Sequence, residues 1–229
     1  MIVFRDVGLV YPNGVHALSN VDLEIGRGEF LFLVGGSGQG KSSLLKCINR
    51  EIDPTSGSVE VDGVRLLDLS PAQIPFLRRK VGVVFQDFKL LQQKTVWENV
   101  AYALQVTGAS SRDVVRRVPR MLELVGIAHK AKMFPYELSG GEQQRNAIAR
   151  SLVNNPLILL CDEPTGNLDP ETSNEIMALL ARINAKGTTV VIATHNQAVV
   201  DRMRKRVVRL SNGRIAHDQE RGHYHIGLG

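Results

Sequence analysis

Hydrophobic and polar residues alternate along the first part of the chain, in short stretches separated by turn-forming residues. This alternation predicts β-strands over residues 2–7, 18–25, 29–34 and 58–61. In such a strand the apolar side chains lie on one face and the polar side chains on the other. We therefore expect these strands to form an antiparallel sheet with one face exposed to water.

Later stretches of the chain are almost wholly apolar and rich in β-branched residues. Residues 157–161 and 188–193 have this character, which is typical of strands in a parallel sheet that is covered on both faces. Helical periodicity over residues 141–154 and 172–184 is interleaved with them. The repeated order of strand and helix predicts an α/β fold with a parallel-sheet core.

The region from about residue 95 to residue 153 has no convincing strand pattern. Residues 97–106 and 112–125 have the apolar spacing of helices, although Pro119 leaves the bounds of the second helix open. We interpret this region as a helical subdomain inserted into the α/β core. Because no low-complexity tract or repeat divides the chain, residues 1–229 are predicted to form a single domain.

The composition narrows the class of protein further. The 229 residues are 43% hydrophobic and 22% charged, which argues against a disordered chain or a coiled coil. The longest apolar runs, such as residues 30–34, are far shorter than the about 20 residues of a membrane-spanning helix. Nor do the first 30 residues contain the apolar block of a secretory signal. We expect a cytoplasmic protein in which Cys47 and Cys161 are buried side chains rather than metal ligands or disulfide partners.

The net charge is less informative than the basic isoelectric point suggests. The 28 Lys and Arg residues exceed the 23 Asp and Glu residues only slightly, which gives a net charge of +5. The basic residues form three clusters whose spacing suits solvated helix faces or segment ends. Contact with an anionic membrane surface or with nucleic acid is the alternative. The clusters are Arg78, Arg79 and Lys80; Arg112, Arg116, Arg117 and Arg120; and Arg202, Arg204, Lys205 and Arg206.

A glycine-rich segment joins the strand predicted over residues 29–34 to a helix-like stretch that follows it. Glycines let successive N–H groups point inward toward phosphate oxygens, and the helix N-terminus adds positive potential. Lys41 supplies a mobile charge for β- and γ-phosphates, and Ser42 offers a hydroxyl to Mg²⁺. A plain glycine-rich turn is the alternative, but a strand before and a helix after the motif favour a nucleotide-binding loop. The segment consists of Gly35, Gly36, Ser37, Gly38, Gln39, Gly40, Lys41, Ser42 and Ser43.

Three polar side chains follow the two apolar strands. Asp162 and Glu163 come after the strand over residues 157–161, and His195 follows the strand over residues 188–194. Ligands of parallel sheets bind at these strand ends. We expect Asp162 to hold Mg²⁺ through its water shell, Glu163 to polarise an attacking water, and His195 to contact the γ-phosphate. A solvated acidic loop and a structural histidine are the alternatives.

A second helix start resembles an anion site but has no phosphate of its own. Ser139 suits an N-cap, and Gly140 and Gly141 expose backbone N–H groups at the start of the helix. These residues belong to the string Leu-Ser-Gly-Gly-Glu over residues 138–142. Together with the glycine-rich loop, Gln86, Asp169 and His195, this string closely resembles the ATP-binding subunit of an ABC transporter. The resemblance spans nearly the whole chain.

The resemblance implies a fold and an assembly. The fold is the α/β fold of a P-loop NTPase of the ABC nucleotide-binding type, with a parallel-sheet core, an N-terminal antiparallel β-subdomain and a helical subdomain insertion. In that family two such domains pack head to tail around ATP. The resemblance therefore implies a homodimer on ATP binding, in which Ser139, Gly140 and Gly141 act on the γ-phosphate of the partner.

The resemblance also implies individual roles. Glu163 is the expected general base, with Lys41, His195 and Gln86 as further catalytic residues. Gln86 joins Ser42 and Asp162 as a metal contact and signals to a membrane partner. Asp169 organises the dimer, and Tyr11 matches the aromatic residue that stacks on adenine; a surface tyrosine at a strand end is the alternative. The implied cofactors are ATP and Mg²⁺.

Finer strings over residues 85–91 and 94–100, and residues 182–184 followed by 187–189, look like the bacterial cell-division subgroup of the family. That resemblance implies an ATPase that changes the conformation of an integral membrane partner, regulates cell-wall hydrolysis and works with other division proteins. Its place is peripheral, on the inner face of the plasma membrane. An ATPase of lipoprotein release or macrolide efflux is the alternative. A nucleic-acid ATPase and a binding-only scaffold fit less well, because this chain lacks long coiled-coil insertions and retains Lys41, Glu163 and His195.

The chain departs from the usual pattern of the family at four positions. These are Gly36, where proline is usual; Gln39, where a small residue is usual; Asn146; and Cys161. Gly36 loosens the loop in this interpretation, but every residue assigned to chemistry is present. We therefore expect an active site.

Overall fold

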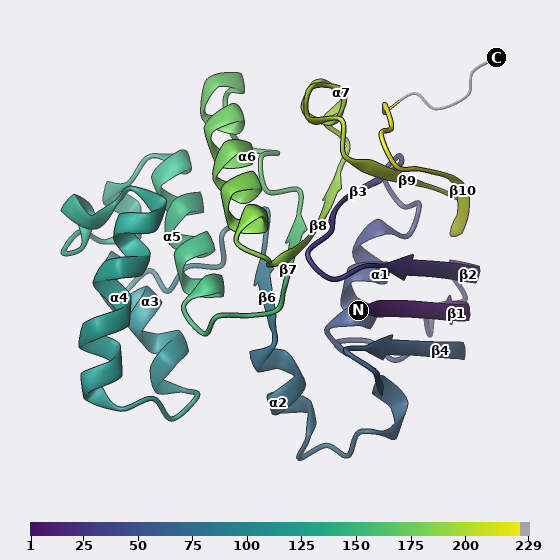
Figure 1. The fold of residues 1–229 in the computed structure, drawn as a ribbon, viewed down its shortest axis with the longest axis horizontal. Helices are drawn as coiled ribbons and strands as arrows, with labels where there is room; N and C mark the ends of the chain where they lie inside the picture. The colour runs from purple at the N-terminus through teal and green to yellow at the C-terminus, as the bar shows by residue number, and fades with distance from the viewer. Residues whose placement is uncertain (225–229) are drawn as a thin grey trace.

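The computed structural model describes residues 1–224, which contain two β-sheets and a set of helices (Figure 1). The smaller sheet has four antiparallel strands in the order β2-β1-β4-β5. Its strands are β1 (Ile2–Val10), β2 (His16–Ile25), β4 (Ser56–Val61) and β5 (Val64–Arg65). Most residues of β2 alternate between buried and exposed, as the alternating sequence pattern predicts for a half-exposed sheet.

The larger sheet has six strands in the order β10-β9-β3-β8-β7-β6. Five of them run parallel, and only β10 pairs antiparallel, with β9. The strands are β3 (Phe30–Val34), β6 (Val81–Val84), β7 (Ile158–Asp162), β8 (Thr189–Thr194), β9 (Arg206–Ser211) and β10 (Arg214–Gln219). Every residue of β3 and β8 is buried.

The position of β3 corrects one expectation. We expected residues 29–34 to join the half-exposed antiparallel sheet, but β3 lies inside the parallel sheet between β8 and β9. Phe30 and Phe32 face one hydrophobic core, while Leu31 and Leu33 face the other. All five residues of β3 are apolar, so both faces of the strand can be buried.

Helices pack on both faces of the parallel sheet, which separates the two hydrophobic cores. α1 packs in the core that lies between the two sheets, whereas α3, α4, α5 and α6 enclose the opposite core. Figure 1 shows α3, α4 and α5 together at one end of the molecule. The helices are α1 (Lys41–Ile48), α2 (Ile74–Arg79), α3 (Val96–Gln105), α4 (Ser111–Val125), α5 (Gly140–Leu152), α6 (Pro170–Ala185) and α7 (Gln197–Met203). Short 3₁₀ turns occupy Leu66–Asp68, Ala128–Lys130 and Pro135–Glu137.

The helix that was uncertain in the sequence is continuous. α4 passes through Pro119, which lies on the exposed face of the helix. A proline inside a helix leaves the carbonyl four residues earlier without its usual N–H partner. That residue is Val115, which is exposed, so water is available to this carbonyl. None of the helices within residues 1–224 combines the length and the apolar character that a bilayer crossing requires.

The expectation that the basic clusters are solvated is wrong for Arg206 and Arg117, which are half-buried, whereas Arg78 is exposed but also binds backbone carbonyls. Arg206 lies in an ion-pair network with only 18% of its side chain exposed. Arg117 donates a hydrogen bond to the carbonyl of Val153, and Arg78 donates to the carbonyls of Asn49 and Arg50. Guanidinium groups provide several donors in a fixed geometry, which suits them to tie together backbone segments. Cys47 and Cys161 are buried free thiols, as expected, and burial raises the pKa of Cys47 to about 12.

Candidate active site

The glycine-rich loop lies between the end of β3 and the start of α1. Its backbone passes so close to neighbouring strands that side chains are excluded at two positions. A Cβ atom on Gly35 would lie 2.5 Å from the carbonyl oxygen of Leu210, and one on Gly40 would lie 2.4 Å from that of Ala17. Gly40 also has a φ of +100°, in the region that glycine alone adopts without strain. By contrast, a Cβ on Gly36 would meet only Gln39, at 3.7 Å.

The side chain of Lys41 lies along this loop. Lys41 is buried, and its Nζ donates hydrogen bonds to the carbonyls of Gly35 at 2.8 Å and Gly36 at 3.0 Å. Within residues 1–224, no carboxylate forms an ion pair with this ammonium group. A buried charge that is solvated only by carbonyl dipoles attracts an anion strongly. The loop therefore offers a positive site to a phosphate.

Asp162 ends β7 beside this loop. Burial raises the pKa of its carboxyl group, while a hydrogen bond with Ser42 and the charge of Lys41 act in the opposite direction. Its Oδ1 atom is buried without a hydrogen-bond partner among the described residues. An orphaned carboxylate oxygen beside a serine hydroxyl fits Mg²⁺, which takes few protein ligands and keeps waters and phosphate oxygens. Within residues 1–224 no group of three or more His, Cys, Asp or Glu side chains could hold a metal by itself.

Glu163 and His195 meet at the neighbouring ends of β7 and β8. The His195 Nδ1 and Glu163 Oε1 atoms are 2.8 Å apart, and the backbone N–H of His195 donates to Oε2 at 3.3 Å. Glu163 has a φ of +49°, a conformation that costs a non-glycine residue free energy and often occurs at functional sites. Its own N–H donates to the carbonyl of Ala193, which holds this turn against β8. The turn directs the Glu163 carboxylate toward His195.

Gln86 lies at the edge of the same site and has a partner that the sequence did not suggest. Its Nε2 donates to Asn167 Oδ1 at 3.4 Å, and Asn167 Nδ2 donates back to the Gln86 carbonyl at 3.3 Å. A hollow of about 650 Å³ is lined by Gln86, Asn167, Ser42 and Asp162, among others. The three residues predicted to contact the metal therefore line one hollow. An asparagine between a strand and a helix has no sequence signal that would have singled it out.

Tyr11 lies next to the start of α1. Its hydroxyl oxygen is 3.0 Å from Ser43 Oγ, and its ring packs against the core between the two sheets. Ser43 is the residue after Ser42 in the glycine-rich motif. The structure thus brings Tyr11 to the start of α1, beside the glycine-rich loop.

Ser139, Gly140 and Gly141 begin α5 in a separate cluster. Ser139 caps the helix by accepting from the N–H of Glu142, and the Glu142 carboxylate accepts from the N–H of Ser139. A Cβ on Gly141 would lie 2.4 Å from a methyl carbon of Thr172, so the starts of α5 and α6 pack tightly together. This reciprocal cap confirms the predicted N-cap at Ser139.

Asp169 belongs to the same cluster as the start of α5. It caps α6 by accepting from the N–H of Thr172 at 2.9 Å, and hydrogen bonds with Thr172 lower the pKa of its carboxyl group. Within the part of the chain that the structure describes, no hydrogen bond or ion pair joins Ser139 or Asp169 to residues 35–43. This cluster therefore makes no polar contact with the glycine-rich loop of its own chain.

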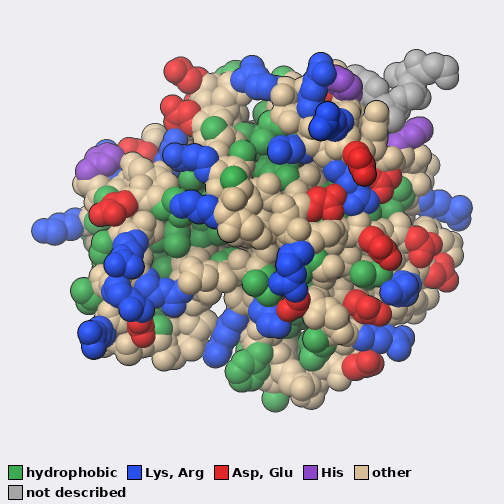
Figure 2. All heavy atoms as spheres, in the orientation of Figure 1, with side chains coloured by type: hydrophobic (Ala, Val, Ile, Leu, Met, Phe, Trp, Pro, Cys, Tyr) green, Lys and Arg blue, Asp and Glu red, His purple; other side chains and the backbone are tan. Residues whose placement is uncertain are grey.

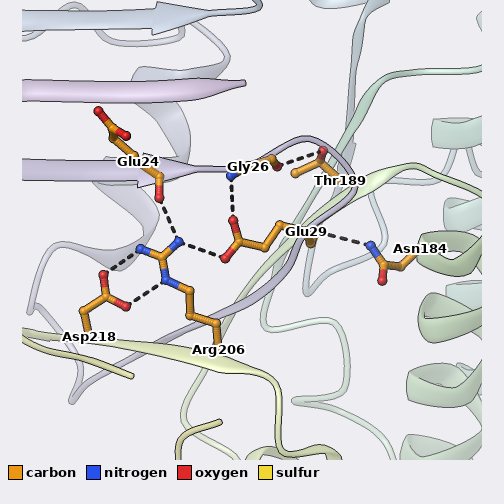
Figure 3. Close-up of polar contacts among 7 residues, drawn as sticks. All are labelled: Glu24, Gly26, Glu29, Asn184, Thr189, Arg206 and Asp218. Atoms are coloured by element: carbon orange, nitrogen blue, oxygen red, sulfur yellow. Dashed lines mark hydrogen bonds and ion pairs between the residues drawn. The ribbon is translucent and has the colours of Figure 1, made fainter. Parts of the chain in front are cut away.

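A larger hollow, of about 990 Å³, opens around Arg206 at the other end of β3. Figure 3 shows that its central charges already contact one another. Arg206 donates to both carboxylate oxygens of Asp218, at 2.8 and 2.6 Å, and to Glu29 Oε1 and the carbonyl of Glu24, both at 2.8 Å. The hydrogen bonds with Asp218, followed by those with Glu29, raise the pKa of Arg206. The charged groups around Arg206 already pair with one another. The carboxyl end of β3, at the glycine-rich loop, is therefore the better candidate for an active site.

Comparison with known proteins agrees with this geometry. The family model described as "ABC transporter" matches residues 18–166. The chain belongs to the ABC transporter family. The curated relatives named cell division ATP-binding protein FtsE include two from different genera. The one from Mycobacterium tuberculosis is 55% identical over 225 residues, 98% of each chain. The one from Streptococcus pneumoniae serotype 2 is 52% identical over 224 residues, 98% of this chain and 97% of the relative.

A solved structure extends the likeness to three dimensions. It is the dimeric, post-hydrolysis ATP-binding cassette MJ0796 bound to ADP and Pi. It is 37% identical in sequence and superposes with a TM-score of 0.87 over 96% of this chain and 98% of that one. These findings confirm the predicted fold class and the membership of the ABC family. The protein is an ABC ATPase, which binds ATP and hydrolyses it.

Proposed function

We propose that this cassette binds MgATP at the carboxyl ends of β3, β7 and β8, dimerises on it, and drives a membrane protein in bacterial cell division. The observation that carries the catalytic part is the convergence of Lys41, Ser42, Asp162, Glu163 and His195 at the ends of adjacent parallel strands. The relatives named FtsE support the part in cell division.

The phosphate loop binds the nucleotide. Its backbone N–H groups, the start of α1 and the ammonium group of Lys41 hold the β- and γ-phosphates. Ser42, Asp162 and Gln86 hold Mg²⁺, which neutralises developing charge on the phosphates when it is bound. Tyr11 stacks on the base, and its hydrogen bond with Ser43 orients the ring.

Glu163 acts on water. Its carboxylate lies at the strand end where the γ-phosphate of a nucleotide held by the loop would point, and it accepts the proton of the attacking water. The contact with His195 orients this carboxylate before ATP binds. His195 then donates to the γ-phosphate. This arrangement makes Glu163 the residue whose loss separates hydrolysis from binding.

The partner subunit completes the site. Ser139, Gly140 and Gly141 of a second copy cover the γ-phosphate, and Asp169 organises the contact between the two copies. The lack of polar contacts between this cluster and the glycine-rich loop of its own chain supports this proposal, as does the dimeric state of the cassette MJ0796. Enclosure between two subunits strengthens the electrostatic contacts and excludes bulk water.

The mechanical output passes to a membrane protein. We propose an integral partner of the FtsX type, which holds the cassette at the inner face of the plasma membrane and regulates cell-wall hydrolases together with other division proteins. Gln86 would report the state of the nucleotide to that partner. Purification of the tagged protein from membranes tests the partner. Recovery of an FtsX-type protein is expected, and recovery of a lipoprotein-release or macrolide-efflux permease instead would contradict the assignment.

Glu163→Gln tests the catalytic proposal. We expect ATP hydrolysis to fall at least about 100-fold, because the proton acceptor is lost. ATP binding should persist and trap a dimer, so light scattering should show twice the mass of the 25.2 kDa chain. Glu123→Gln, an exposed substitution on α4, is the matched control and should hydrolyse ATP normally. Hydrolysis near the wild-type rate in Glu163→Gln would contradict the role of Glu163.

A further inference from the structure

We propose that the surface around α2 binds the headgroup region of an anionic lipid bilayer directly. We use the name basic–apolar patch for the exposed residues Val64, Arg65, Leu67, Phe76 and Arg79, of which Val64 and Phe76 line one hollow and Arg79 lies over the ring of Phe76. Its three apolar members are unusually exposed for large hydrophobic side chains, at 39% for Val64, 39% for Leu67 and 60% for Phe76. Figure 2 shows hydrophobic side chains gathered at the lower edge of the molecule, where Figure 1 places α2, with basic side chains beside them.

The charge of this surface complements an anionic bilayer. Residues 64–80 contain four basic residues and one acidic residue. The whole chain, by contrast, has 28 basic and 23 acidic residues, so its charges nearly balance. The side chain of Arg65 makes no hydrogen bond or ion pair with the other described residues. The guanidinium carbon of Arg79 lies 4.9 Å from the ring centroid of Phe76. Neither charge is neutralised within the patch.

The combination of side chains favours a lipid interface over a protein. A hollow of about 300 Å³ beside α2 is lined by Val64, Phe76 and Leu77, among others. A stable protein interface buries about 800 Å² on each partner, whereas three exposed apolar side chains, of which Val64 and Phe76 line this hollow, offer only a small contact. An aromatic ring flanked by long basic side chains suits the boundary between headgroups and acyl chains, where arginines extend toward phosphates. This lipid contact would add to the binding energy from a membrane protein partner, and it does not require such a partner.

Vesicle sedimentation tests the proposal with the full-length protein. The probes are vesicles of phosphatidylcholine alone and vesicles that also contain roughly one quarter phosphatidylglycerol. Wild-type protein should sediment only with the anionic vesicles. Arg65→Glu combined with Arg79→Glu should weaken this binding at least about 25-fold, since each basic residue near the surface contributes about fivefold. Phe76→Ser should weaken it about fivefold through lost apolar insertion.

A second basic surface supplies the matched control. On α4, Arg112 and Arg120 are also exposed, and their side chains likewise have no polar partner among residues 1–224. Arg112→Glu combined with Arg120→Glu changes net charge by the same amount and should weaken vesicle binding no more than about threefold. ATP hydrolysis should be unchanged in all these variants, which separates this proposal from the assignment of the catalytic site.

Three outcomes would overturn the lipid proposal. One is no sedimentation of wild-type protein with anionic vesicles. Another is an equal loss of binding for the charge reversals on α2 and on α4, which would indicate a net-charge effect. The third is full vesicle binding by Phe76→Ser and by the α2 charge reversals, together with loss of a protein partner in the same variants. That last result would make the patch a protein-binding surface.

Discussion

The two ends of β3 hold the two main charged clusters of this protein, and they differ in how their charges are satisfied. At the amino end, Arg206 pairs with Glu29 and Asp218 and also donates a hydrogen bond to the carbonyl of Glu24. At the carboxyl end, Lys41 contacts only carbonyls, and one oxygen of Asp162 is buried without a partner among the described residues.

This difference separates a structural cluster from a site that needs a ligand. The Arg206 cluster joins the end of β2, the start of β3 and the hairpin of β9 and β10, so it stabilises the junction of the two sheets (Figure 3). The phosphate end has a cation and an anion that do not neutralise each other fully. In the proposed function, MgATP supplies both of the missing charges, a polyanion for Lys41 and a cation for Asp162.

Arg206→Met should produce the largest loss of stability. It leaves Glu29 and Asp218 beside each other without their shared cation, so the free energy of unfolding should fall by about 3 kcal/mol. Denaturant unfolding measures this change. Arg5→Met is the control, because Arg5 is 61% exposed and pairs with Glu60 only at 3.7 Å; it should cost no more than about 0.5 kcal/mol. Equal losses would show that the Arg206 network has no special structural role.

Gly40→Ala should have the next largest effect. Its Cβ would collide with the Ala17 carbonyl, and alanine is strained at a φ of +100°, so we expect a loss of about 2 kcal/mol together with weaker ATP binding. Gly36→Ala is the matched control, because its Cβ has room and its φ is not in the left-handed region. Thermal unfolding with and without MgATP distinguishes them. If Gly36→Ala were as damaging as Gly40→Ala, steric exclusion would not explain the loop glycines.

Asp162→Asn should have the smallest effect on stability, and of opposite sign. Burial raises the pKa of this carboxyl group, so its ionised form at neutral pH destabilises the folded protein. Removing the charge should raise the free energy of unfolding without nucleotide by about 1 kcal/mol, or roughly 2–4 °C in Tm. The further stabilisation by MgATP over ATP alone should be lost. A lower Tm without nucleotide would contradict the description of Asp162 as an uncompensated charge.

The sequence predicted the fold well where the signal was local. The strand predicted over residues 157–161 is offset by one residue from the observed strand β7. Ser139 caps α5, as the residues that follow it suggested. The assignment of β3 to the antiparallel sheet was wrong, because proximity along the chain was given more weight than its five consecutive apolar residues. A fully apolar strand indicates burial on both faces, and that signal was present.

The candidate site was predictable in its motifs but not in its pairings. The phosphate loop, the acidic strand end and His195 are recognisable because each follows a strand or a glycine pattern. Arg206 was grouped with solvated arginines because two of its three partners, Glu29 and Glu24, lie 177 and 182 residues away in sequence. The third partner, Asp218, lies 12 residues away and is brought close by the pairing of β9 with β10. Asn167 was missed for the same reason, since it is 81 residues from Gln86. Long-range pairing of this kind depends on strand order, which local patterns do not specify.

Calorimetric titration of ATP into Lys41→Ala, in the presence of Mg²⁺, tests the central claim most directly. That claim is that the uncompensated charge at the carboxyl end of β3 is the nucleotide site. Affinity should fall at least about 100-fold, because a charge-assisted contact with two phosphates is lost. Lys132→Ala, on an exposed turn, should bind ATP within about twofold of wild type. Unaltered ATP affinity in Lys41→Ala would contradict the claim.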